Sequence, residues 1–154
     1  MAMDDRAIIE RLKDKYKDKN TEGFTILDFI SACGSPVEAI AYSKLFWPDF
    51  VKFHNMVFLS DTLETAADRD RVIEGFQKYG LDRRTTEEAF NVLEIPNFFA
   101  RHGGESTDEE DIYLAERIAE MWRHRLAQQF PHRQFVVQVV DAEDVEIGVT
   151  FYQK

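Results

Sequence analysis

At 154 residues, with 44% hydrophobic and 13% aromatic residues, the chain is long enough for one domain that folds without disulfides or metals. Its one cysteine, Cys33, excludes an intrachain disulfide, and no apolar run reaches the roughly 20 residues of a membrane span. The formal net charge is −10, and residues 61–154 hold 11 basic and 20 acidic side chains, which disfavours binding to nucleic acid. We therefore expect a single soluble, cytoplasmic domain, residues 1–154, that contacts neither membrane nor nucleic acid.

Three helices are predicted before residue 47. Apolar residues at three- and four-residue steps predict the first over residues 4–19. Thr25, followed three residues later by Asp28, predicts a capped second helix that ends at Gly34 in a left-handed conformation. The run Ser35-Pro36-Val37-Glu38 then predicts the start of a third helix. Ser35 can cap the helix, Pro36 has no amide hydrogen to leave unpaired in the first turn, and Glu38 can hydrogen-bond to the amide of the capping residue.

The stretch from residue 42 to residue 58 is the most aromatic in the chain. Pro48 interrupts any straight helix there. One narrow helix face cannot bury all six rings, so we expect the segment to be central or to form a contact surface. The six rings belong to Tyr42, Phe46, Trp47, Phe50, Phe53 and Phe58.

Two shorter helices are predicted next. Asp61 or Thr62 is expected to cap a helix that stops at Gly80, and Thr85 to cap one that ends at Pro96. Residues 97–102 are predicted to form one further turn before the joint Gly103-Gly104.

The clearest signals come last. Thr107 caps and Pro131 stops a long helix over residues 107–130, whose apolar stripe has helical spacing. The acidic residues 108–111 at its start interact favourably with the positive end of the helix dipole. From Phe135 the apolar period becomes two, which predicts two strands joined at residues 141–144. We therefore predict an α+β fold, predominantly helical, with about six helices and a C-terminal antiparallel hairpin packed on helix 107–130.

The chain contains no phosphate-binding loop, dinucleotide fingerprint, nucleophile elbow or HExxH motif. Glu116, Glu120 and His124 share a predicted helix face, but an ion-pair row explains this spacing better than a metal site. No cofactor and no metal are predicted. The residues predicted to bind a partner or ligand are Trp47, Phe50, Phe53, His54 and His102.

Two functional hypotheses follow. The first is a small acidic protein-interaction protein without catalytic activity, because aromatic anchors dominate interface energies and catalytic motifs are missing. Its partner is another protein or a second copy of the chain, bound through segment 42–58 or the edge of the C-terminal hairpin. The alternative is an enzyme or ligand-binding protein whose site combines dispersed residues such as His54 and His102 with carboxylates.

Overall fold

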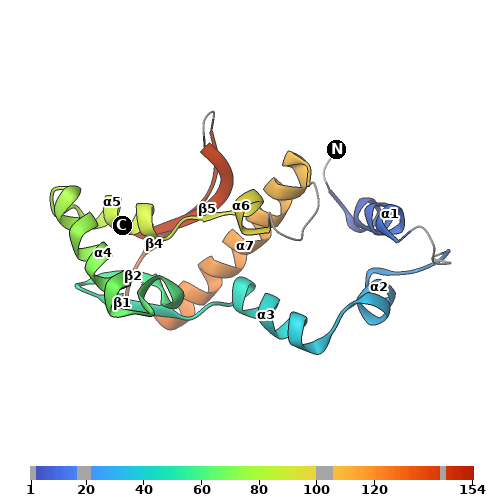
Figure 1. Cartoon of the computed structure of the whole chain (residues 1–154), viewed down its shortest axis with the longest axis horizontal. Coiled ribbons are helices and arrows are strands. Elements are labelled where there is room, and N and C mark those ends of the chain that lie inside the picture. The colour runs from blue at the N-terminus through green and yellow to red at the C-terminus, as the bar shows by residue number, and fades with distance from the viewer. Residues whose placement is uncertain (1–2, 17–21, 100–105, 143–144) are drawn as a thin grey trace. The chain divides into compact units, whose positions relative to one another are not determined.

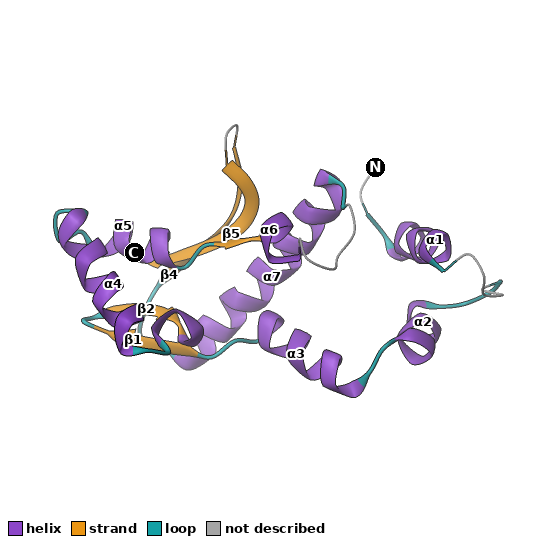
Figure 2. Cartoon of the chain, viewed as in Figure 1, coloured by secondary structure: helices purple, strands orange, loops and turns teal. Residues whose placement is uncertain are grey.

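The computed structural model describes residues 3–16, 22–99, 106–142 and 145–154. These residues form seven α-helices, a short 3-10 helix and five strands, so the predicted α+β fold is confirmed (Figures 1 and 2). The chain divides into two compact units, Met1–Ser43 (unit 1) and Lys44–Lys154 (unit 2). The expectation of one domain over residues 1–154 stays a prediction.

Unit 1 contains helices α1 (Asp5–Lys15) and α2 (Ile26–Cys33) and most of α3 (Pro36–Phe46). The predicted cap of α2 is present: the Thr25 hydroxyl accepts from the Asp28 amide at 3.3 Å, and the Asp28 carboxylate accepts from the Thr25 amide at 2.8 Å. Hydrogen bonds to the Asp28 carboxylate from the Thr25 amide, and then from the Thr25 hydroxyl, lower the pKa of Asp28. Gly34 corrects the prediction, because its φ of −85° is extended, not left-handed. Its amide still ends the helix by donating to Ile30 O at 2.8 Å.

A three-stranded antiparallel sheet forms the middle of unit 2, in the order β3 (Leu93–Glu94), β5 (Val145–Gln153), β4 (Phe135–Ala142). The predicted hairpin is therefore β4–β5, in which Val137 pairs with Phe151. The third strand comes from the same chain. It approaches closely because β5 carries glycine at position 148, where a Cβ would collide with the Leu93 carbonyl.

Helix α7 (Asp108–Gln129) covers one face of this sheet, as predicted (Figure 1). Its Thr107–Glu110 capping box starts it where the sequence indicates. Trp122 lies 1% exposed among Phe50 and Phe151, with edge-on ring contacts at 6.3 and 5.9 Å. Edge-on geometry is favourable for aromatic pairs. The main core of unit 2 therefore lies between α7 and β5.

A second hairpin, β1 (Phe50–Phe53) and β2 (Met56–Leu59), precedes the 3-10 helix Ser60–Leu63. Its two-residue turn, His54-Asn55, has φ angles of 48° and 64°, the left-handed geometry that matches the twist of a tight hairpin. The buried residues Met56 and Phe58 pack with Val72 in a second, smaller apolar cluster.

Helices α4 (Ala66–Lys78), α5 (Arg83–Phe90) and α6 (Ile95–Phe99) complete unit 2. Two predicted caps are wrong by a few residues. Thr65, in a capping box with Asp68, caps α4, and Asp82 caps α5 by accepting from the Thr85 amide at 2.8 Å. The sequence offers several Asp and Thr residues in each region, and only the backbone path selects one. Pro96, expected to end a helix, instead lies in the first turn of α6.

A buried polar cluster joins α5 to both hairpins. Glu87, 0% exposed, accepts hydrogen bonds from the amides of Val57 at 2.8 Å and Gln153 at 2.7 Å, and from the Gln153 side chain. Asn91, also 0% exposed, bonds to main-chain atoms of β2 and to the Phe151 carbonyl. Buried polar groups cost free energy unless they are paired, and here the pairing ties three segments together.

Candidate functional site

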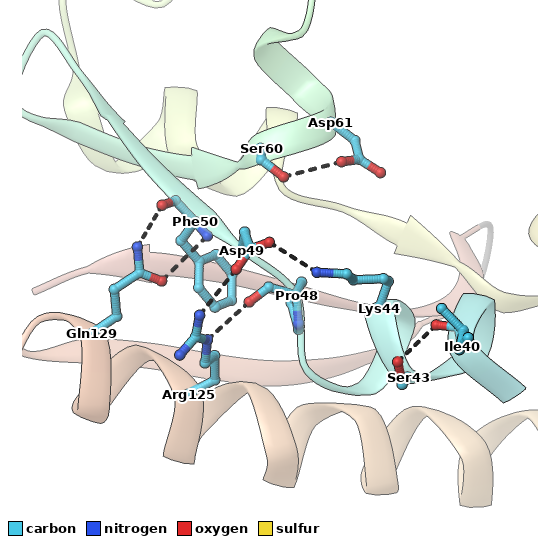
Figure 3. A network of polar contacts seen from close by, with 10 residues as sticks. All are labelled: Ile40, Ser43, Lys44, Pro48, Asp49, Phe50, Ser60, Asp61, Arg125 and Gln129. Carbon is cyan, nitrogen blue, oxygen red and sulfur yellow. Dashed lines mark hydrogen bonds and ion pairs between the residues drawn. The ribbon is translucent and has the colours of Figure 1, made fainter.

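Side chains of helix α7 hydrogen-bond to main-chain atoms of the segment from Leu45 to Phe50. Figure 3 shows the bonds of Arg125 and Gln129. Trp122 Nε1 donates to Leu45 O at 2.9 Å, and Arg125 Nε to Pro48 O at 3.1 Å. Gln129 exchanges hydrogen bonds with both the amide and the carbonyl of Phe50. These helix positions are three and four residues apart, so one face of α7 fixes the whole segment.

Trp47 sits on this fixed segment with 38% of its surface exposed. The Arg125 guanidinium lies 5.8 Å from its ring centroid, within cation–π range. Arg125 and Lys44 also pair with Asp49, at 3.0 and 3.2 Å (Figure 3). Hydrogen bonds from Lys44 and then Arg125 lower the pKa of Asp49. Trp47 is thus a partly exposed ring on a segment that hydrogen bonds hold to α7 and that charged side chains flank.

The other predicted binding rings have different surroundings. Phe50 is 3% exposed in the main core, against Trp122 and Phe151. Phe53 is half-buried against the smaller cluster. Binding of a partner by these residues stays a prediction, and a ring buried as deeply as Phe50 offers no surface to a folded partner.

The structure places one of the two predicted histidines. His54 is exposed in the β1–β2 turn, with its ring 4.4 Å from that of Phe53, whereas His102 lies outside the described residues. Among the described part of the chain, no three His, Cys, Asp or Glu side chains lie close enough to share a metal. In the predicted row of Glu116, Glu120 and His124, the Glu120 carboxylate pairs with Arg117 at 3.0 Å. The main-chain carbonyl of Glu120 lies 2.9 Å from His124 Nδ1.

Apolar side chains on α2 face two ways. Ile26, Phe29 and Cys33 form one side, where Phe29 is 3% exposed and meets the Phe24 ring edge-on at 5.4 Å. Leu27 and Ile30 form another side and are 75% and 57% exposed. A helix with a second, uncovered apolar side is typical of a contact surface.

Helix α3 continues this exposure, since none of its residues is buried. Val37 and Ile40, three residues apart, are 73% and 64% exposed, and Tyr42 is 51% exposed. Residues 24–43 contain two charged side chains, Asp28 and Glu38. Phe29 is the one buried side chain among the described residues of unit 1. In the described residues, this combination of exposed apolar side chains and few charges is the strongest indication of a contact surface.

The β4 edge of the sheet, predicted as a second contact surface, is partly occupied. Arg123 donates from Nε and Nη2 to the Val137 carbonyl at 3.2 and 2.9 Å. The Val137 carbonyl points away from β5. Gln134 O, three residues earlier, accepts from Lys154 N, and carbonyl directions alternate from residue to residue along an antiparallel strand. A strand that pairs with β4 must displace this guanidinium.

Two features of the site were missed from the sequence. The hairpin at residues 50–59 was not predicted, although aromatic and β-branched residues flank His54-Asn55, and asparagine tolerates positive φ. The exposure of Leu27 and Ile30 on α2 could not be predicted, because apolar periodicity does not tell a covered face from an open one.

Searches of protein-family models, curated proteins and solved structures gave no match to this chain. Among the described residues, no helix is long and apolar enough to span a membrane.

Proposed function

We propose that this protein is a non-catalytic interaction protein that associates with a second copy of itself through α2 and α3. One observation carries the proposal. Five large apolar side chains in residues 27–42 are each more than half exposed: Leu27, Ile30, Val37, Ile40 and Tyr42.

The energetic scale supports a stable contact. Full burial of one such side chain contributes about 1.5–3 kcal/mol, and a symmetric dimer covers five from each copy. Association costs roughly 4–15 kcal/mol in lost freedom of motion. Because the five side chains are 51–75% exposed, the gain from covering them is of the same order as that cost, and a stable dimer requires burial of most of them in both copies.

Charge favours a second copy as the occupant. Residues 61–154 have a net charge of −9, so two copies repel each other there, whereas residues 24–43 have a net charge of −2. Two copies that meet through α2 and α3 bring together segments that hold two charged side chains each. The shielded β4 edge is the less favourable route to a dimer.

Light scattering on the size-fractionated full chain tests the proposal. We expect twice the 18.0 kDa chain mass at micromolar concentration, and the chain mass for Val37→Asp/Ile40→Asp. Phe98→Asp is the matched control, because Phe98 is 56% exposed on α6, and this variant should remain a dimer. A monomeric wild-type chain at high concentration refutes the proposal, as does a double variant that remains dimeric with unchanged circular dichroism.

A further inference from the structure

Unit 2 carries an open groove where the start of α5 meets the start of β4 and the end of β5. Two adjoining hollows, of about 560 and 510 Å³, share Arg83, Gln153 and Lys154 in their walls. Arg84 and Tyr152 line the first hollow, and Arg133 lines the second. The groove is thus basic although the chain is acidic.

In the part of the chain that the structure describes, no aspartate or glutamate side chain lies within 4 Å of the three groove arginines. Arg83 donates to Lys154 O at 3.1 Å, and Arg84 to the Tyr152 hydroxyl at 2.9 Å. Arg133 donates to Asn55 O at 3.2 Å and to the Gln153 side chain at 2.6 Å. By contrast, Arg71, Arg117 and Arg125 each pair with an aspartate or glutamate.

Neutral contacts hold two of these guanidinium groups in place. Arg84 lies 4.3 Å from the ring centroid of Tyr152, and Arg133 is bonded to two segments. A guanidinium has five N–H donors, so each group retains donors for a ligand. Holding a charged group in position before binding reduces the ordering cost when the ligand arrives.

Asp82 is the single acid among the described residues that line the groove. Its carboxylate already caps α5, and hydrogen bonds from Thr85 lower its pKa, with smaller contributions from Arg84 and Arg83. It therefore offsets only part of the positive charge.

We infer that the groove binds a short acidic peptide segment through Arg83, Arg84 and Arg133. Guanidinium forks match carboxylate groups, and the groups span two adjoining hollows, which a chain of carboxylates reaches more completely than one small anion. The groove is open, as an extended peptide requires. The nearby Glu87 carboxylate is buried and already accepts three hydrogen bonds. At an ionic strength of 0.1 M, charges beyond about 10 Å are screened, so the more distant acids of unit 2 do not prevent binding. A nucleic acid backbone, which extends over many phosphates, meets those acids.

Fluorescence anisotropy with a fluorescein-labelled hexaglutamate peptide tests the inference. The protein carries a Gly-Ser extension after Lys154, so that the Lys154 oxygen to which Arg83 donates is a neutral peptide carbonyl. We expect saturable binding that weakens between 50 and 200 mM NaCl, and no binding of hexalysine at the same site. Arg83→Gln and Arg84→Gln should each raise the Kd by about tenfold, because each removes one charge-assisted contact with the peptide.

Arg117→Gln is the matched control, because it removes the same charge from an exposed site on α7. It should change the Kd by less than about twofold. An equal effect of Arg117→Gln overturns the site, since binding would then follow overall charge. Failure of the wild-type chain to bind hexaglutamate overturns it as well. If inorganic phosphate competes at equal charge concentration, the groove takes small anions and the peptide assignment is wrong.

Discussion

Helices α2 and α7 begin alike and end up in different surroundings. Both start with a threonine capping box, Thr25 with Asp28 and Thr107 with Glu110. Yet α2 buries one side chain, Phe29, while α7 buries six. Local sequence thus decides where a helix starts, and tertiary packing decides how much of it is covered. This is why α7 organises a core and α2 presents a surface.

The largest expected effect lies in the core that α7 covers. Trp122→Ala should lower the free energy of unfolding by about 3–5 kcal/mol, because it leaves a cavity beside Phe50 and Phe151. Met121→Ala, on the exposed side of the same helix, should cost less than about 1 kcal/mol. Urea unfolding followed by far-UV circular dichroism measures both. Similar losses would show that α7 does not organise the core.

The buried polar cluster gives the next effect. Glu87→Ala leaves the amides of Val57 and Gln153 without their acceptor, which should cost about 2–5 kcal/mol. Glu38→Ala, an exposed carboxylate on α3 that bonds the Ser35 hydroxyl, should cost less than about 1 kcal/mol. The same unfolding measurement applies. A small loss at Glu87 would mean that the cluster does not tie the two hairpins together.

The two caps give the smallest and most direct test of the comparison. Thr107→Ala should lower the stability of unit 2 by about 1 kcal/mol. Thr25→Ala should leave the urea midpoint of unit 2 unchanged and raise amide hydrogen exchange in α2, because α2 buries so little. Exchange measured by mass spectrometry separates the outcomes. Equal shifts of the midpoint would show that α2 is as tightly packed as α7.

Much of the fold could be predicted from local signals. Capping residues and periodicity place α2, α7 and the β4–β5 hairpin, because those signals lie within a few residues of each other. The caps of α4 and α5 are displaced because several short polar residues compete for the same role. The third strand, β3, could not be predicted, since two residues carry no periodicity and its pairing depends on distant Gly148.

The candidate sites were less predictable for the same reason. The aromatic count at residues 42–58 drew attention to the right region, but exposure separates Trp47 from Phe50, and exposure follows from where α7 lies. The groove combines Arg83 and Arg84 with Arg133, about fifty residues apart in the chain. No spacing rule links such positions before the sheet forms.

The hydrogen bonds from Gln153 to Glu87 also bear on the order in which parts of the chain fold. Strand β5 follows every other described element in the sequence, so a ribosome makes it after α5, the β1–β2 hairpin and α7. Until β5 pairs, Glu87 lacks two of its donors and Trp122 lacks the Phe151 ring. The rings of Trp122 and Phe50 therefore lack part of their cover until β5 has been made. Apolar surface that is exposed in such an interval favours aggregation.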